Sequence, residues 1–158
     1  MSNIWFIGDI HGGHRNVHKF RKQFQSEEDH FQHVKDNFHK VVKKRDKVFF
    51  MGDTAFTLER LQDISTWVCG RKVLICGNHD TDHIPMKILC EYFDEVYSLY
   101  KWHEFWLSHC PIHPEELRGK LNVHGHVHHA TLNDKRYFNT SLENTGFYPV
   151  DLRSEERR

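Results

Sequence analysis

The chain has 158 residues, of which 22 are Lys or Arg, 22 are Asp or Glu and 15 are His, and 38% are hydrophobic. This length and composition fit one globular domain with a sizeable core. The balance of charge argues against nonspecific nucleic-acid binding and against binding to a membrane surface, because both usually need a net basic face. Any affinity for phosphate is therefore expected to come from a local site.

Short apolar runs bounded by turn residues alternate with segments of helical period, a pattern typical of layered α/β proteins. In chain order, the expected elements are a strand at Asn3 to Ile7, a helix at Val17 to Phe24, a helix opened by the cap-like Ser26 and running to Val41, a strand at Lys47 to Met51, a helix at Leu58 to Cys69, a strand at Lys72 to Ile75, a helix at Ile84 to Phe93, and strands at Val96 to Tyr100, Glu104 to Ser108, Leu121 to Val123 and Tyr137 to Leu142. The stripe of Val17, Phe20 and Phe24 is predicted to be a buried helix face.

A single domain is predicted for residues 1–151, followed by a charged tail over residues 152–158. The N-terminal apolar run is short, lacks a basic flank and is interrupted by Asp9, so neither a signal peptide nor a membrane span is expected. The four cysteines lie far apart and form no CxxC pair. Reduced thiols and a cytoplasmic location fit this pattern best.

Side chains that can bind metal follow five of the expected strands. They are Asp9 and His11 after the first strand, Asp53 after the second, Asn78, His79 and Asp80 after the third, His109 after the strand that ends at Ser108, and His124, His126 and His128 after Val123. In layered α/β proteins, ligands collect at the carboxyl ends of strands, so these residues could converge on one crevice.

Each of these motifs is weak evidence when taken alone. Gly77-Asn78-His79-Asp80 could be a tight turn, because Gly and Asn both tolerate positive φ, and a single His109 is more often a core histidine than a ligand. Together, carboxylate, amide and imidazole groups suit a borderline divalent cation such as Mn, Fe or Zn. On an extended chain, His126 and His128 share a face, on which His124 is a competing candidate.

In this order, Asp9-x-His11, Gly52-Asp53, Gly77-Asn78-His79-Asp80, His109 and Gly125-His126-x-His128 resemble the signature of the calcineurin-like metallophosphoesterases. The likeness extends from the first strand to about Val150. The pieces HGGHRN, LSHCP, NVHGHVH and FYPV resemble the small single-domain bacterial and phage members. The resemblance implies a four-layer α/β/β/α sandwich around two mixed β-sheets.

The resemblance also implies two divalent metal ions, with Mn preferred and Fe, Zn, Ni or Mg as alternatives. The first ion would be held by Asp9, His11, Asp53 and His128. The second would be held by Asp53 as the bridging ligand, Asn78, His109 and His126. His79 would stand beside the substrate as the catalytic histidine.

The chain departs from the pattern of many members at Phe56 and Thr57, where the family has Asp and Arg. The family's Asp orients the catalytic histidine, so Asp80 is expected to orient His79 instead. Loss of the Arg removes a bidentate clamp for phosphate, which makes efficient hydrolysis of small monoesters less expected. His14 and Asn16 are candidates to line the substrate pocket, and the alternative for Asn16 is to cap the following helix.

The sequence therefore predicts a phosphodiesterase for small or nucleotide-like diesters, in which a hydroxide shared by the metals attacks phosphorus. A phosphomonoesterase at the same site is the nearest alternative. A binding scaffold without catalysis is disfavoured because every inferred ligand is present, and a structural zinc protein is disfavoured because closed zinc sites favour cysteine. The oligomeric state is left open.

Two further groups of residues are given structural interpretations. His18, His30, His33 and His39 fall in or beside the helices and are predicted to lie on the surface. Aromatic residues at 102, 105 and 106 could stack on a nucleobase, although aromatic residues in strands usually belong to the core.

Overall fold

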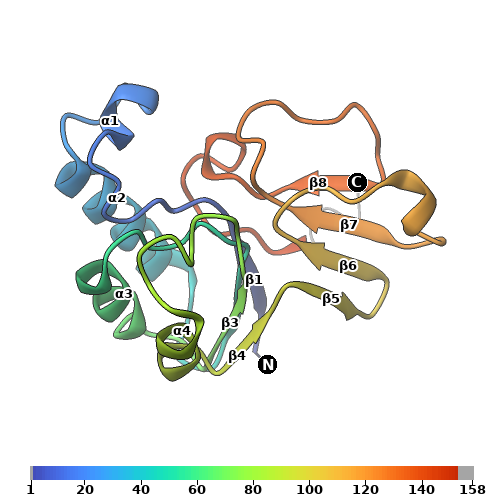
Figure 1. Cartoon of the computed structure of the whole chain (residues 1–158), viewed down its shortest axis with the longest axis horizontal. Helices are drawn as coiled ribbons and strands as arrows, with labels where there is room; N and C mark the ends of the chain where they lie inside the picture. The colour runs from blue at the N-terminus through green and yellow to red at the C-terminus, as the bar shows by residue number, and fades with distance from the viewer. Residues whose placement is uncertain (1, 153–158) are drawn as a thin grey trace.

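The computed structural model describes residues 2–152, which form two four-stranded sheets with α-helices on one side (Figure 1). The first sheet has the order β1-β2-β3-β4, with β1 at Ile4–Ile7, β2 at Lys47–Phe50, β3 at Arg71–Ile75 and β4 at Glu95–Tyr97. The second has the order β5-β6-β7-β8, with β5 at Leu99–Trp102, β6 at Phe105–Ser108, β7 at Leu121–His124 and β8 at Tyr137–Asn139. The predicted α/β class is confirmed.

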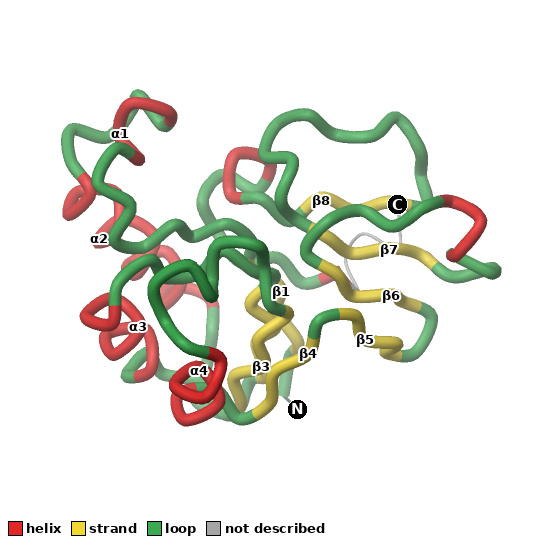
Figure 2. The backbone as a smooth tube through the Cα atoms, viewed as in Figure 1, coloured by secondary structure: helices red, strands yellow, loops and turns green. Residues whose placement is uncertain are grey.

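The four α-helices all belong to the half of the chain that builds the first sheet, whereas the red segments beside the second sheet are short 3₁₀ helices (Figure 2). They are α1 at Val17–Phe20, α2 at Glu27–Val41, α3 at Leu58–Ser65 and α4 at Met86–Tyr92. Every connection in the first sheet thus contains a helix, and its four strands are parallel, as helical crossovers require. The second sheet is mixed, because β5 and β6 are antiparallel whereas the other pairs are parallel. Among the described residues, its connections carry only the 3₁₀ helix η1 at Pro114–Glu116, and a second 3₁₀ helix, η2 at Leu142–Asn144, follows β8.

The segment predicted as one strand at Val96 to Tyr100 is divided between the two sheets. Residues up to Tyr97 pair with β3, and residues from Leu99 onward pair with β6. Ser98 is where the chain leaves one sheet for the other. An apolar run does not reveal which neighbour each part will pair with, so this break has no local signal.

Helix α1 ends four residues earlier than predicted, at Phe20. Arg21 turns inward after it and is 4% exposed, with hydrogen bonds from its guanidinium to the carbonyls of Asp9 and Ile10. Val17 and Phe24 are buried as expected, but Phe20 is 75% exposed, so its predicted place in a buried stripe is wrong. The hydrogen bonds of the buried Arg21 therefore fix the chain direction after Phe20, and the helical spacing does not continue to Phe24.

Two apolar cores hold the layers together. One lies between the helices and the first sheet and contains Phe31, Phe38 and Trp67 among its buried side chains. The other packs side chains of both sheets together and includes Phe6, Phe49, Met51, Phe105, Leu107 and Val123. The aromatic strand residue 105 is therefore core, and residue 102 packs against the same cluster, consistent with the structural interpretation.

Leu152, the first residue of the predicted tail, belongs to the second core and is 5% exposed. The rest of the predicted tail, residues 153–158, lies outside the described residues. The four cysteines are free, and burial raises the pKa of the Cys76 thiol to about 12, which disfavours thiolate chemistry there. No helix in residues 2–152 is both long and apolar enough to cross a membrane.

His30 is fully buried, which contradicts its predicted surface position. Its ring packs against Phe24 and Phe147, and its Nε2 accepts a hydrogen bond of 2.8 Å from the Arg21 guanidinium. Burial, followed by the charge of Arg21, lowers the pKa of His30 to about 3. The folded protein therefore holds this imidazole neutral.

This burial predicts an acid-sensitive stability. The unfolded chain binds a proton at His30 near the ordinary pKa of 6.5, whereas the folded chain does so only near 3, so stability is fully present above pH 6.5 and is lost as the pH falls toward 3. The variant His30→Gln keeps an uncharged acceptor for Arg21. The free energy of unfolding is measured in urea with chelator at pH 7 and at pH 4.5. Over this interval the wild type is expected to lose roughly 2–3 kcal/mol more than the variant. Equal losses in the two proteins would contradict this assignment.

Candidate metal centre

The loops that follow β1 and β2 run side by side and carry the first candidate ligands. The Asp9 amide donates to the Gly52 carbonyl at 3.2 Å, and the His11 amide donates to the Asp53 carbonyl at 2.9 Å. The segments after β6 and β7 are tied together in the same way, because the Gly125 amide donates to the His109 carbonyl at 2.8 Å. The carboxyl ends of strands from both sheets therefore meet at one place.

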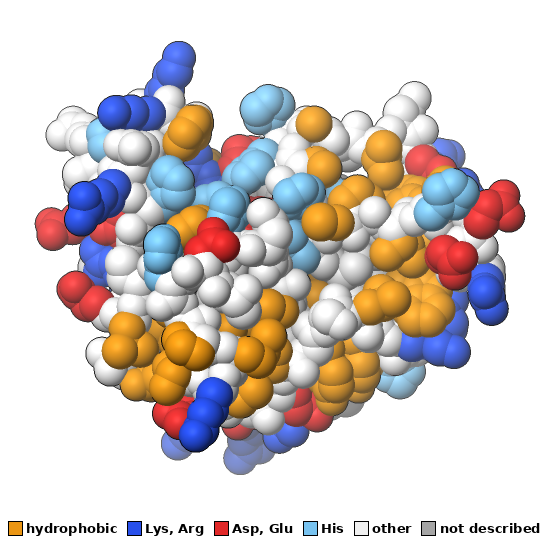
Figure 3. Space-filling model, viewed as in Figure 1, with side chains coloured by type: hydrophobic (Ala, Val, Ile, Leu, Met, Phe, Trp, Pro, Cys, Tyr) orange, Lys and Arg blue, Asp and Glu red, His pale blue; other side chains and the backbone are white. Residues whose placement is uncertain are grey.

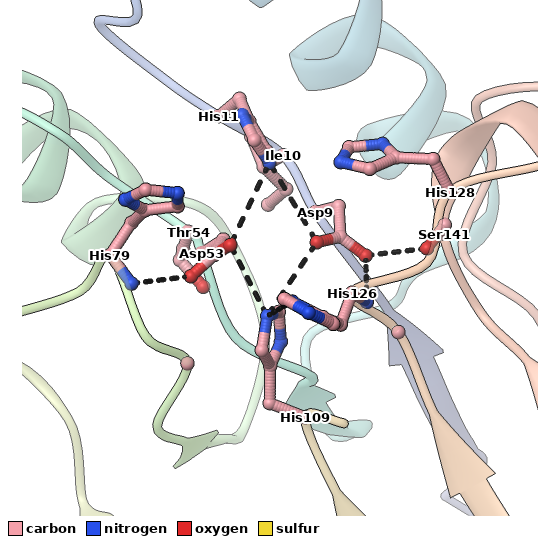
Figure 4. A network of polar contacts seen from close by, with 12 residues as sticks. Asp9, Ile10, His11, Asp53, Thr54, His79, His109, His126, His128 and Ser141 are labelled. Atoms are coloured by element: carbon pink, nitrogen blue, oxygen red, sulfur yellow. Dashed lines mark hydrogen bonds and ion pairs between the residues drawn. The ribbon is translucent and has the colours of Figure 1, made fainter. Parts of the chain in front are cut away.

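Six predicted ligands form two clusters there (Figure 4). One consists of Asp9, His11 and His128, and the other of Asp53, His109 and His126. Within each cluster, the potential ligand atoms of the three residues lie within 4.8 Å of one another. Three of the ligands predicted for the first ion thus lie together, as do three of those predicted for the second, while Asn78 belongs to neither cluster.

Each aspartate has one oxygen held by the protein and one directed at the imidazoles. Asp9 Oδ2 accepts hydrogen bonds from the His126 amide at 2.9 Å and from the Ser141 hydroxyl at 2.5 Å. Asp53 Oδ1 accepts from the His79 amide at 2.8 Å. Its other oxygen, Oδ2, lies 3.2 Å from His109 Nε2 and 3.9 Å from His11 Nε2, so this carboxylate faces a ring nitrogen of each cluster.

Two buried polar atoms at this place lack a hydrogen-bond partner among the described residues. They are Asp9 Oδ1 and His11 Nε2, which lie 3.7 Å apart. Leaving such atoms unsatisfied is costly, and their presence in a native fold calls for an explanation such as an ion. A cation bound to both atoms would satisfy them, and a set of carboxylates and imidazoles suits a borderline divalent metal. The residues therefore fit the predicted ions.

The imidazoles are oriented by acceptors behind them. His109 Nδ1 lies 2.8 Å from the Met51 carbonyl oxygen, and His128 Nδ1 lies 2.9 Å from Glu143 Oε2. A ring that donates its Nδ1 proton presents Nε2 as a lone-pair donor to a metal. Glu143 is in turn paired with the buried Arg21 at 2.5 Å. Glu143, Arg21 and Ser141 were not predicted, because no motif or spacing connects them to the ligands.

The pKa shifts match the requirements of a cation site. Burial raises the pKa of Asp53, but the bond and charge of His109 and the amide of His79 outweigh it, so the net shift is downward. Burial lowers the pKa of His11, which keeps that ring neutral. Burial also opposes protonation of His109, but Asp53 and Asp9 outweigh it and raise its pKa to about 9. A proton and a cation therefore compete for this place.

The backbone at the clusters is held in the left-handed region. Of the eight described non-glycine residues with positive φ, five are candidate ligands: Asp9, His11, Asp53, His126 and His128. Such conformations cost of the order of 1–3 kcal/mol each and tend to occur at functional sites. Gly125 meets a different need, the close approach of the backbone to a ligand, since a Cβ on it would lie 2.5 Å from Asp9 Oδ2.

His79 and Asp80 occupy the loop after β3, but they do not contact each other as predicted. The Asp80 carboxylate is buried and accepts from the backbone amides of Asp53, Thr54 and Gly77. Burial raises its pKa to about 6. The partner of His79 is Asp82, whose Oδ2 lies 2.6 Å from the imidazole Nδ1. Asp82 therefore takes the orienting position that the sequence assigned to Asp80.

The remaining predicted site residues lie around this loop. Asn78 is exposed and directly precedes His79. The ring of Phe56 lies among three imidazoles, with centroid distances of 5.0 Å to His11, 5.1 Å to His14 and 5.3 Å to His79. An aromatic ring thus fills the position for which the family resemblance implies Asp.

Two other predictions near the site have different outcomes. Asn16 is exposed at the start of α1, and its side chain makes no capping hydrogen bond, so the predicted cap is wrong. His124 is fully buried, with Nδ1 directed at the Gly125 carbonyl and its ring against Tyr137, and it belongs to neither cluster.

The model of the calcineurin-like phosphoesterases matches residues 2–156. The chain belongs to this family. It is 40% identical over 90 residues to the gene 66 protein of Mycobacterium phage D29, a match that covers 54% of this chain and 44% of that protein, and thus less than half of the relative's length. It is 30% identical over 164 residues to the gene 66 protein of Mycobacterium phage L5, covering 81% of this chain and 78% of the relative.

A solved structure shares the whole fold. The protein of unknown function AQ665 from Aquifex aeolicus superposes with a TM-score of 0.78 at 26% identity, over 99% of both chains. The chain thus combines the fold of the calcineurin-like phosphoesterases with two candidate metal sites among its described residues.

Proposed function

We propose that this protein hydrolyses phosphodiesters of small or nucleotide-like type, using two divalent cations, with Mn²⁺ preferred. The observation that supports it best is the pair of clusters facing one carboxylate, Asp53, beside the buried unpartnered atoms of Asp9 and His11. In this proposal the first ion is held by Asp9, His11, Asp53 and His128. The second is held by Asp53, Asn78, His109 and His126.

Two such ions, when bound, supply Lewis acidity toward phosphoryl oxygens and lower the pKa of water. The chain's own contribution is to fix the ligands before substrate arrives. Ser141 and the His126 amide lock Asp9, and Glu143 locks the ring of His128. The proposed reaction forms a bond from a water oxygen to phosphorus and breaks the bond from phosphorus to the leaving oxygen, without a covalent enzyme intermediate.

His79 is the proposed general acid of this reaction. Its Nδ1 is held by Asp82, so Nε2 is the nitrogen that would give a proton to the leaving oxygen. The imidazole is partly exposed, at 43%, and lies 6.4 Å from the His11 ring between centroids. Asp82 would act as a positioning residue, which keeps the ring beside the leaving group.

The charges around the site favour a diester over a monoester. Arg60 follows the Phe56-Thr57 pair, but its guanidinium already donates two hydrogen bonds to Glu27, from Nε at 2.9 Å and from Nη2 at 2.6 Å. The nearby Arg21 is likewise bound by Glu143. Since these two arginines are already paired, they offer no clamp for the second negative charge of a monoester dianion. A singly charged diester needs no such clamp.

The proposed setting is the cytoplasm, which the four free thiols support. The proposed partners are limited to a small phosphoester or nucleotide substrate. The balanced charge supports the absence of nonspecific nucleic-acid binding and of a membrane partner.

The experiment compares bis(4-nitrophenyl) phosphate with 4-nitrophenyl phosphate, which release the same chromophore. Protein stripped with chelator is assayed before and after Mn²⁺ is added. We expect no hydrolysis without metal and a kcat/KM for the diester at least about tenfold above that for the monoester after loading, equivalent to about 1.4 kcal/mol. A preference for the monoester would reverse the order of the two functions, and activity without any metal would overturn the proposal.

A further inference from the structure

A groove with a volume of about 460 Å³ opens beside the cluster of Asp9, His11 and His128. It lies between α1 and the turn that follows β7, and its volume falls in the usual range of small-molecule pockets, about 300–1,000 Å³. His11 and His128 line the groove and also belong to the cluster. A molecule whose phosphate is held by the cluster can therefore extend into the groove.

The walls of the groove are largely apolar and aromatic. Val17 and Phe20 come from α1, and Val127 comes from the opposite turn. The Phe20 ring is 75% exposed and lies in a T-shaped arrangement with the His14 ring, at 5.7 Å between centroids. Figure 3 shows histidine side chains gathered along the upper part of the molecule, between the helical half and the second sheet. Phe20 is thus an exposed aromatic face beside the candidate metal centre.

The charged groups that line the groove are already paired with each other. Arg21 is bonded to Glu143, and its remaining donors reach the carbonyls of Asp9 and Ile10 and the ring of His30. Glu143 also holds His128. Neither charge is left to bind a second phosphate or an ammonium group, so the groove suits an uncharged occupant.

His79 lies away from the groove, on the other side of the clusters. Figure 4 shows His79 and His128 at opposite sides of the site, with Asp53, His11 and Asp9 between them. The ring distances agree, because His11 is 5.0 Å from His128 and 6.4 Å from His79. If the leaving group departs on the side of His79, the groove on the side of His128 is free for the other substituent of phosphorus.

We propose that this groove binds the retained substituent of the phosphodiester, and that this substituent is a planar aromatic group, such as a nucleobase, stacked on Phe20. The inference rests on the proposed function, and it names the substrate class. Stacking between a base and an aromatic side chain is worth about 1–3 kcal/mol by alanine substitution, and it accepts any base because every base has a flat face. A monoester has no retained substituent to fill this groove.

The test uses 4-nitrophenyl esters that share one leaving group and differ in the retained group: methyl, phenyl and thymidine 5′-phosphate diesters. Phe20→Ala is expected to raise KM for the phenyl and thymidine esters by about 5- to 100-fold, to leave kcat within about twofold, and to leave the methyl ester unchanged. Phe20→Tyr should keep the wild-type KM values. Leu99→Ala, which removes an exposed apolar side chain from β5, is the matched control and should change none of them.

An equal rise of KM for all three esters would place the leaving group in the groove and overturn the assignment. No rise for any ester would also overturn it. Calorimetric binding of phenylphosphonate and methylphosphonate to the Mn²⁺-loaded protein tests the groove without hydrolysis. We expect the wild type to prefer phenylphosphonate and Phe20→Ala to lose that preference. Equal binding of the two phosphonates by the wild type would refute the groove even if hydrolysis succeeds, whereas a preference without hydrolysis would support the groove and count against the proposed function.

Discussion

Asp53→Ala is expected to abolish metal-dependent hydrolysis and to leave fewer than two metal ions per chain. Asp53 is the only carboxylate proposed to serve both ions, and its Oδ2 faces His11 at 3.9 Å and His109 at 3.2 Å. The ions contribute +4 against −2 from Asp9 and Asp53, so losing them changes the sign of the site's charge from attraction to repulsion of a phosphate. The predicted loss is larger than that for any single orienting residue.

The measurement pairs elemental analysis of the purified variant with its turnover of bis(4-nitrophenyl) phosphate in excess Mn²⁺. Asp53→Asn keeps an oxygen for the His79 amide and tests whether the loop still folds. Asp36→Ala removes an exposed carboxylate from α2 and is the control, with activity and metal content expected at wild-type levels. An Asp53→Ala protein with two ions and full activity would refute the shared-ligand proposal.

The ligand clusters could be predicted because each candidate is tied to a local feature, the end of a strand. Parallel strands bring such ends to one edge, so the sequence alone predicts that Asp9, Asp53 and the Asn78 loop lie near each other. Strand ends also placed His109 and His126 among the residues that could converge there. Their assignment to one ion followed from the resemblance to a family, since no spacing rule connects two sheets.

The contacts behind the ligands could not be predicted in this way. The choice between Asp80 and Asp82 as the partner of His79 depends on the loop's backbone, in which three amides need a buried acceptor and draw Asp80 inward. Glu143 reaches His128 across 15 residues, in a segment with no metal-binding pattern. Such contacts arise from tertiary packing, which periodicity does not encode.

The same limit explains the errors at Phe20 and His30. Helical spacing assigned one to a buried face and the other to the surface, and both assignments are reversed in the fold. The common cause is Arg21, which ends α1, turns inward and requires uncharged or acidic neighbours such as His30 and Glu143. The burial of Arg21 thus accompanies both an exposed Phe20 ring beside the site and a buried His30 ring.

His79→Ala is expected to keep both metal ions and to lose about 10²–10⁴-fold in kcat for a phenyl diester. The loss should be much smaller for a 2,4-dinitrophenyl diester, because that leaving group departs without a proton. Asp82→Asn, which weakens the 2.6 Å contact with Nδ1, should show the same dependence on the leaving group with a smaller loss. Asp36→Asn, on the exposed surface of α2, serves as the matched control.

This dependence on the leaving group distinguishes the loss of proton transfer by His79 from misfolding of its loop. A misfolded loop would lose both substrates equally and would also lose metal, because His79 follows the proposed ligand Asn78 and its amide holds Asp53. A general acid that has lost its proton or its orientation instead fails in proportion to how much the leaving oxygen needs protonation. Equal losses for the two diesters with metal retained would remove His79 from proton transfer and leave it only a role in binding.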